Sequence, residues 1–396
     1  MDNRHKDIKT GNRIRNIIIK IISIILIIPP LLSSCLKEEA DGQPVKVSRT
    51  ILFYMAGDNS LAEEISEKTD ALAAACNLEE GCHLLVYQNR GRNYNSRLLK
   101  AGNGKTEVLA EYAEHKVTLA QDLTRAINEM MLFCPGSSDY GFVVFARTAG
   151  WLPSGSHTSP TRAAENTSDA TDESTVFDFE DFARILPAGL FRFIVFESDL
   201  MAGIEVAYEL KEKTGYILAS SAGLQPTGFT PVYDKMLARL YRQEPELSGF
   251  AADYYEYCSR LPGDAGSVTV SVISTAGIAP FKNFLTKVEE DNVEHWEWVK
   301  RDKIQHFDLR KSDHLFYDLE GYIRSIGTQQ DINRLAGLLD GVVVYKAATQ
   351  SFMPGDPYGY DIGTHCGLTV YIPSAKYPYL NTRRGLLSLF SEYQGQ

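Results

Sequence analysis

The chain has 396 residues, of which 44% are apolar and 23% are charged. These values are typical of globular proteins, so they exclude a chain that is disordered throughout. The length predicts two or three ordinary domains, or one large α/β domain with additions. The net charge is −11 and no stripe of Lys and Arg opposes it, which argues against nucleic acid as a partner. Six Cys residues in a chain of this length exclude a disulfide-based scaffold.

The N-terminus has the features of a bacterial lipoprotein signal. Residues 1–20 are rich in Lys and Arg, and residues 21–32 form an Ile/Leu run that is shorter than the roughly 20 residues of a membrane span. Leu32-Ser33-Ser34-Cys35 follows at once and resembles a lipobox. We therefore expect residues 1–34 to be a lipoprotein signal peptide, Cys35 to carry the lipid, and residues 35–48 to be a tether. The alternative is a simple signal peptide followed by an incidental Cys.

Strand and helix patterns alternate after residue 48. Continuous apolar runs predict buried strands, and the spacing of apolar residues predicts the helices between them. A capping box of Ser60 and Glu63 marks the start of the first helix. Strands are expected at Thr50–Ala56, 84–87, 141–145, 191–196 and 216–219, and helices from residue 60, at 119–134 and at 201–213. This order predicts a mostly parallel sheet with helices on both faces.

After the tether, we expect a core over residues 49–265 and a C-terminal part over residues 266–396. Residues 152–174 are rich in Ser, Thr, Pro and acidic residues, which predicts a long loop inside the core. The C-terminal part is expected to complete the sheet and to pack on the core. Its predicted strands are 268–272, 342–345 and 368–372, and its predicted helices are 281–288, 315–326, 332–339 and 386–393.

Five ordered segments resemble the clostripain family of cysteine peptidases, in the caspase-like clan. They are residues 53–61 (FYMAGDNSL), 140–153 (YGFVVFARTAGWLP), 193–210 (FIVFESDLMAGIEVAYEL), 345–349 (YKAAT) and 367–373 (GLTVYIP). The resemblance extends from about residue 48 to residue 394. It implies an α/β fold, namely a caspase-like αβα sandwich with a mostly parallel central sheet and C-terminal additions.

The resemblance also locates two positions where this chain departs from the family. Members carry a His in a pattern like W-S-H-G-x-G-W-L-P, and the matching residue here is Arg147. Members carry the nucleophile in a pattern like F-D-A-C-L-M, and the matching residue is Asp199. A guanidinium stays protonated and cannot act as a general base, and a carboxylate is a weak nucleophile toward an amide. The sequence therefore predicts a degenerate dyad, and an ion pair between Arg147 and Asp199 in its place.

An acidic residue two positions before the family's Cys holds a basic substrate side chain, and Glu197 occupies that position. The resemblance thus implies that Glu197 binds a substrate Arg or Lys, since carboxylates pair well with guanidinium. The alternative is a Glu bonded to local backbone or to Arg147. If the chain were active, self-cleavage would be expected at Arg162, the one basic residue of the predicted loop.

No other residues form a convincing catalytic or metal-binding pattern. Ser198 is expected to point away from Asp199, and His157 lies in the predicted loop. Cys134 and Cys366 are expected to be core thiols, and a Cys76–Cys82 disulfide is left open. The remaining His residues show no ligand spacing; they are His83, His115, His295, His306, His314 and His365. The sequence predicts no cofactor and no metal ligand, and it leaves calcium binding undecided.

The sequence thus predicts a clostripain-like peptidase homologue without catalytic activity. It would be a lipid-anchored protein of the bacterial cell envelope, at the outer membrane or cell surface, that binds basic peptides or a protein partner. One alternative is an active endopeptidase specific for Arg or Lys, with a non-standard cysteine-type site. The other is a structural envelope subunit without a ligand.

Overall fold

The computed structural model describes residues 49–57, 61–77, 81–91, 93–113, 119–153, 177–387 and 389. The expected signal peptide, Cys35, the tether and Ser60 lie outside the described residues. So does most of the predicted loop at 152–174, with His157 and Arg162. No helix in the described part of the chain is both long and apolar enough to span a membrane.

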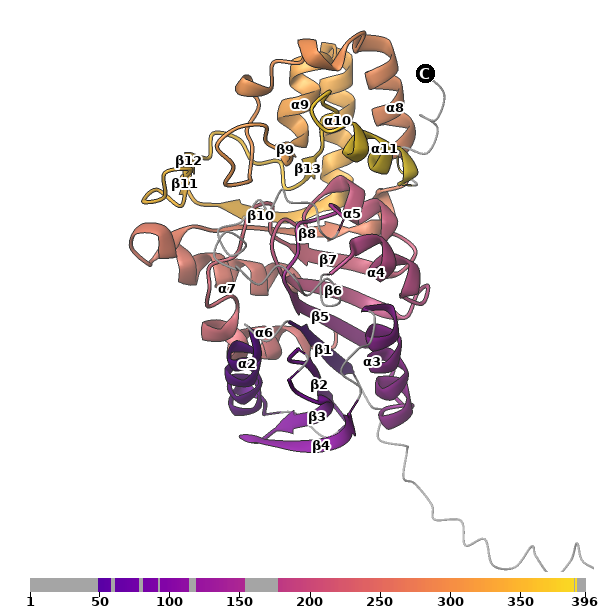
Figure 1. Cartoon of the computed structure of the whole chain (residues 1–396), viewed down its shortest axis with the longest axis vertical. Helices are drawn as coiled ribbons and strands as arrows, with labels where there is room; N and C mark the ends of the chain where they lie inside the picture. Colours follow the sequence, from indigo (N-terminus) through magenta and orange to yellow (C-terminus); the bar gives the residue numbers. More distant parts are fainter. Residues whose placement is uncertain are drawn as a thin grey trace, which may run out of the picture. The chain divides into compact units, whose positions relative to one another are not determined.

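A nine-stranded mixed sheet forms the centre of the described chain (Figure 1). Its order is β10-β8-β7-β6-β5-β1-β2-β3-β4, with five parallel strands in the middle, from β7 to β2, and antiparallel pairs at both edges. The strands are β1 (Thr50–Ala56), β2 (His83–Asn89), β3 (Ser96–Gly102), β4 (Lys105–Tyr112), β5 (Tyr140–Ala146), β6 (Phe191–Glu197), β7 (Thr214–Ala219), β8 (Thr269–Ser274) and β10 (Val343–Ala348).

Helices cover both faces of this sheet, so its central strands are buried on both sides. On β1, Leu52 and Tyr54 belong to one core, whereas Ile51 and Phe53 belong to the other. The first core contains α3 (Leu119–Phe133), α4 (Phe179–Ile185), α5 (Ile204–Glu209), α8 (Phe281–Asn292), α9 (Leu319–Ile326), α10 (Gln329–Val342) and part of α11 (Pro378–Leu386). The second contains α2 (Ala62–Ala75), α6 (Tyr233–Leu240) and α7 (Leu247–Ser259). The α/β caspase-like sandwich predicted from the sequence is confirmed (Figure 1).

The antiparallel β3–β4 hairpin was not predicted from the sequence. Its two-residue loop is Asn103-Gly104, and both residues have positive φ, at 53° and 72°. Asn-Gly is the preferred loop of a type I′ hairpin, because both residues tolerate this left-handed backbone. The strand pattern was missed because β4 is largely exposed and shows no apolar alternation.

The C-terminal part contributes to the same sheet through β8 and β10, and the described residues belong to one compact unit. Some predicted elements differ in extent. The helix expected at 201–213 covers only Ile204–Glu209, and the one expected at 315–326 begins at Leu319 because Asp318 caps it. The last helix is Pro378–Leu386, and neither Leu387 nor Leu389 is helical.

Short elements complete the described part of the chain. Two small two-stranded sheets pair β11 (Ser351–Phe352) with β12 (Tyr360–Asp361) and β13 (Thr369–Val370) with β9 (Tyr317–Asp318). The short 3₁₀ helices are η4 (Thr230–Val232), η5 (Gly263–Gly266), η6 (Thr275–Gly277), η7 (Trp296–Trp298) and η8 (Arg301–Lys303).

The cysteines support stability through packing. Cys134 and Cys366 are buried free thiols, as expected for core residues, and burial raises the pKa of both. Cys76 is also a buried free thiol, so it forms no disulfide with Cys82. Burial raises the pKa of the Cys76 thiol to about 12, which keeps it protonated and unreactive at neutral pH.

Candidate functional site

Arg147 and Asp199 lie at the carboxyl ends of two adjacent parallel strands. Arg147 directly follows β5, and Asp199 comes two residues after β6, while Phe145 and Glu197 are register partners at the end of this strand pair. Both residues line the same pocket. Ligands of open α/β sheets commonly bind at this edge, outside the carboxyl ends of the strands.

No ion pair between Arg147 and Asp199 is found among the described residues, so this prediction gains no support from the structure. Asp199 Oδ1 accepts the backbone N–H of Leu224 at 2.6 Å, so its carboxylate faces the loop after β7. Arg147 is exposed, and it acts electrostatically on Glu64. Burial raises the pKa of Glu64, and the positive charges of Lys68 and Arg147 oppose that rise.

Backbone geometry fixes Asp199 in its place. Leu200, the next residue, has φ of +61° and is fully buried, although this left-handed conformation is unfavourable for a side chain like Leu. Its N–H donates to Ala222 O, and Thr148 Oγ1 donates to Asp199 O at 2.7 Å. The loops after β5, β6 and β7 therefore hold one another at the pocket. Retained strain of this kind often marks a functional position.

Ser198 does not contribute a reactive hydroxyl. It is buried, its Oγ donates to Val144 O, and it accepts the N–H of Ala146, both at 3.2 Å. The hydroxyl thus joins β6 to β5.

Glu197, the expected binder of a basic substrate side chain, is engaged by groups of the chain itself. Lys68 Nζ lies 2.6 Å from Glu197 Oε1, and the N–H of Phe229 donates to the same oxygen at 2.8 Å. Tyr233 donates its hydroxyl to Glu197 Oε2 at 2.7 Å. The Glu197 side chain is only 1% exposed. Lys68, a cation of the protein's own α2, therefore occupies the position beside this carboxylate. The sequence analysis had named local backbone and Arg147 as alternative partners of Glu197, but not Lys68.

Lys68 reaches Glu197 because it lies on the buried face of α2. This face also carries Ile65 and Leu72, three and four residues away, which is helical spacing. The ammonium is held further by Thr230 Oγ1 at 2.9 Å and lies over the ring of Phe145. A Lys within an apolar stripe was the sequence signal for this buried pair, and it was overlooked.

The pocket at these strand ends has a volume of about 520 Å³. None of the described residues that line it is Cys or His. They are Leu61, Glu64, Phe145, Ala146, Arg147, Glu197, Ser198, Asp199, Gly223, Leu224, Gln225, Pro226, Gly228, Asp264, Ala265, Leu309, Phe352 and Met353. The pocket thus offers apolar surface and carboxylates, but no thiol or imidazole from the described chain.

One contact between a nucleophile and an imidazole lies close by, between Ser221 Oγ and His365 Nε2 at 3.1 Å. Ser221 is fully buried and is not among the residues that line the pocket. Burial lowers the pKa of His365 to about 3, so this imidazole is a weak base at neutral pH. His365 is only partly buried, but Ser221 is not exposed to a substrate in the pocket.

His306 and His314 showed no ligand spacing in the sequence, but the fold brings them together with Asp308. In each side chain, one atom that could bind a metal ion lies within 4.8 Å of the corresponding atoms of the other two. The pattern His-x-Asp, followed six residues later by His, was the available signal. This cluster belongs to the loop before β9, and Leu309, the residue after Asp308, lines the pocket.

A sequence model of the clostripain family matches residues 53–368. The chain belongs to the clostripain family. A comparison with curated protein sequences found no match.

Solved structures of clostripain-family proteases share the fold. An inactive zymogen C11 protease from Parabacteroides distasonis is 24% identical, with a TM-score of 0.73, covering 87% of this chain and 97% of that chain. A secreted C11 cysteine protease from Bacteroides thetaiotaomicron is 17% identical, with a TM-score of 0.72 and coverage of 87% and 98%. A structure of a secreted C11 cysteine protease from the same organism with an irreversible peptide inhibitor is 22% identical, with a TM-score of 0.70 and the same coverage.

Proposed function

We propose that this clostripain-family chain is a peptide-binding protein that does not hydrolyse peptide bonds. The observation that carries the proposal is the pair Arg147 and Asp199 at the ends of β5 and β6, in a pocket whose described lining includes no Cys and no His. Cysteine peptidases need a thiolate to attack the carbonyl and an imidazole to transfer the proton. Arg147 and Asp199 supply neither group.

The charge of the pocket supports a basic peptide as the ligand. Glu197 is balanced by Lys68, which leaves Glu64, Asp199 and Asp264 against Arg147 among the charged residues of the lining. Carboxylates near an incoming Arg or Lys give charge-assisted hydrogen bonds. Basic recognition would then depend on the rim of the pocket, because Glu197 is already paired.

Apolar surface supports binding of an extended segment instead of a lone cation. Phe145, Leu224, Leu309 and Phe352 line the pocket together with Met353. Pockets that combine apolar walls with a few polar groups are the usual binding sites of proteins. A peptide with one basic and one apolar side chain would match both features.

Two assays on the purified full chain test the proposal. Fluorogenic peptides ending in Arg or Lys should show no release of the fluorophore above a blank without protein. A labelled Arg-containing peptide should bind in a fluorescence polarisation assay, and the same peptide with Glu in place of Arg should bind at least about tenfold more weakly, since a like charge opposes the carboxylates.

A matched pair of variants localises the binding. Glu64→Gln should weaken the basic peptide several-fold, whereas Asp291→Asn, which removes one carboxylate from an exposed position on α8 outside the pocket, should not. Turnover of the fluorogenic peptide by the purified chain would support the alternative endopeptidase. Equal binding of the Arg and Glu peptides would contradict basic recognition.

We also propose that Cys35 anchors the protein to the bacterial envelope through a lipid. The Ile/Leu run followed by Leu32-Ser33-Ser34-Cys35 supports this proposal. Metabolic labelling with an alkyne fatty acid should mark the expressed chain, and Cys35→Ser should abolish the label. Labelling that persists in Cys35→Ser would contradict the proposal.

A further inference from the structure

The loop from Ile304 to Phe316 folds back on itself and places two imidazoles side by side. Phe307 donates its N–H to Phe316 O at 2.9 Å, and Asp318 donates to Gln305 O at 2.8 Å, so the two arms of the loop are joined like a hairpin. His306 forms a bridge with Tyr317 across these arms. The loop geometry thus holds His306 and His314 together without any secondary-structure element of their own.

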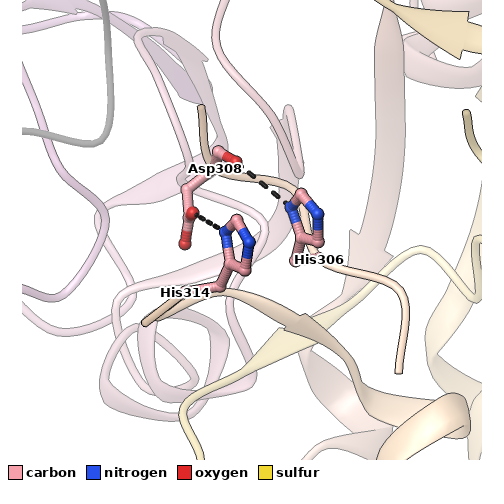
Figure 2. Close-up of side chains that lie close together, drawn as sticks. All are labelled: His306, Asp308 and His314. Atoms are coloured by element: carbon pink, nitrogen blue, oxygen red, sulfur yellow. Dashed lines mark hydrogen bonds and ion pairs between the residues drawn. The ribbon is translucent and has the colours of Figure 1, made fainter. Parts of the chain in front are cut away.

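Figure 2 shows Asp308 beside both imidazoles, with its carboxylate joined to His314 and its backbone carbonyl joined to His306. Its Oδ2 accepts the N–H groups of Leu315 and Phe316, at 2.6 and 3.1 Å, which fixes the carboxylate. Its Oδ1 lies 2.6 Å from His314 Nδ1, and its carbonyl oxygen lies 3.2 Å from His306 Nδ1. The Asp308 side chain is fully buried, so its carboxylate oxygens are held in place and shielded from water.

The two imidazole rings stack with their centroids 3.4 Å apart and their planes 10° from parallel. Tyr360 packs edge-on against His306, and its hydroxyl donates to Phe307 O at 2.6 Å, which closes one side of the cluster. The His314 side chain is 18% exposed, so the cluster has a route to solvent. Two imidazoles and one buried carboxylate are thereby held together in a site with one open side.

We propose that His306, Asp308 and His314 form a binding site for a divalent transition-metal ion, with Zn²⁺ as the best fit. One nitrogen of each imidazole and Asp308 Oδ1 would be the three protein ligands, and water would complete the coordination. Two His and one carboxylate are a common three-ligand set for zinc with an open position. Nitrogen and oxygen ligands lie about 2.0–2.2 Å from Zn²⁺. The three ligand atoms already lie within 4.8 Å of one another, and binding of one ion requires the two stacked imidazole rings to rotate so that a nitrogen of each points at it.

The donor set explains the choice of ion. Imidazole nitrogens disfavour Ca²⁺ and Mg²⁺, which prefer a shell of oxygens. Neutral imidazole is the form that binds metal. The hydrogen bonds that now join the donors would be replaced by bonds to the ion.

Calorimetric titration of Zn²⁺ into the metal-stripped full chain tests the site. One ion should bind per chain, and His306→Gln or His314→Gln should each weaken binding at least about tenfold, because even the loss of a residue that only orients a metal ligand costs 10–100-fold. His295→Ala is the matched control, since His295 is exposed and lies outside the cluster. It should leave the affinity unchanged.

Substitution with Co²⁺ gives a second readout that is independent of affinity. Its visible absorption should appear on titration of the full chain and of His295→Ala, and should be lost in His306→Gln/His314→Gln. Circular dichroism of each metal-free variant checks folding, and His314→Gln carries the test if His306→Gln unfolds, because His314 is partly exposed. If the full chain binds no Zn²⁺ when one ion per chain is added, the cluster is only a structural His–Asp pair. The same conclusion holds if the variant His306→Gln/His314→Gln still binds the ion.

Discussion

Lys68 and Glu197 form an ion pair inside the fold, with 2.6 Å between Nζ and Oε1 and with side chains only 2% and 1% exposed. The pair joins α2 to the carboxyl end of β6, next to Asp199. The N–H of Phe229, in the segment before α6, and the hydroxyl of Tyr233, the first residue of α6, also donate to this carboxylate. One buried carboxylate therefore joins α2, β6 and the start of α6.

Removal of one partner of this pair should strongly destabilise the protein. In Lys68→Met, Glu197 would remain buried without its cation, and loss of one partner of a buried pair costs on the order of 3–5 kcal/mol. Urea unfolding should show this loss as a lower midpoint. Lys287→Met removes a Lys from an exposed pair on α8, with Asp291, and should cost less than about 1 kcal/mol.

The double variant Lys68→Met/Glu197→Gln separates the charge effect from packing. It should be more stable than Lys68→Met, because the unpaired buried charge is removed as well. Equal stability of the single and double variants would mean that the ion pair is not the source of the loss.

Gly228 should not tolerate a side chain. Its φ is +51°, and a Cβ there would overlap Glu197 Oε1 and lie 3.1 Å from Lys68 Nζ. Gly189 has a similar φ of +63°, but a Cβ there meets no atom within 4 Å. Gly189→Ala should therefore cost only the backbone strain, about 1–2 kcal/mol. Gly228→Ala should cost clearly more in the free energy of unfolding, because the buried pair must also move; an equal cost would contradict the packing described here.

Glu205 should make stability depend on pH. It is fully buried, and burial raises the pKa of its carboxyl from 4.5 to about 7, although the N–H of Tyr371 and the charge of Arg384 oppose the rise. The folded state thus binds this proton more tightly than the unfolded state. The contribution to stability is fully present below pH 4.5 and is lost as the pH rises through 7, by about 3 kcal/mol.

Glu205→Gln isolates this effect, because the amide keeps an acceptor for the Tyr371 N–H but does not titrate. The free energy of unfolding of the wild-type chain minus that of the variant should fall between pH 4.5 and pH 8. A difference that stays constant over this range would show that the Glu205 carboxyl titrates alike in the folded and unfolded chains.

The central strands could be predicted because their sequence and their environment agree. Residues 50–56 and 191–196 are nearly continuous apolar runs, and both faces of these strands are covered by helices. The β3–β4 hairpin could not be found from apolar pattern because β4 lies at the exposed edge of the sheet. Only the Asn103-Gly104 loop signalled it, through the positive φ that both residues adopt.

The sequence by itself determined that residues 147 and 199 carry a guanidinium and a carboxylate, and that they follow adjacent strands. It could not determine their partners, since side-chain contacts depend on which distant segments pack together. Tertiary packing placed Lys68 beside Glu197 across 129 residues, turned Asp199 toward Leu224, and gathered His306 with Asp308 and His314. These contacts arise from helix placement and loop closure, so the local patterns around Lys68 and His306 could not by themselves identify the partners.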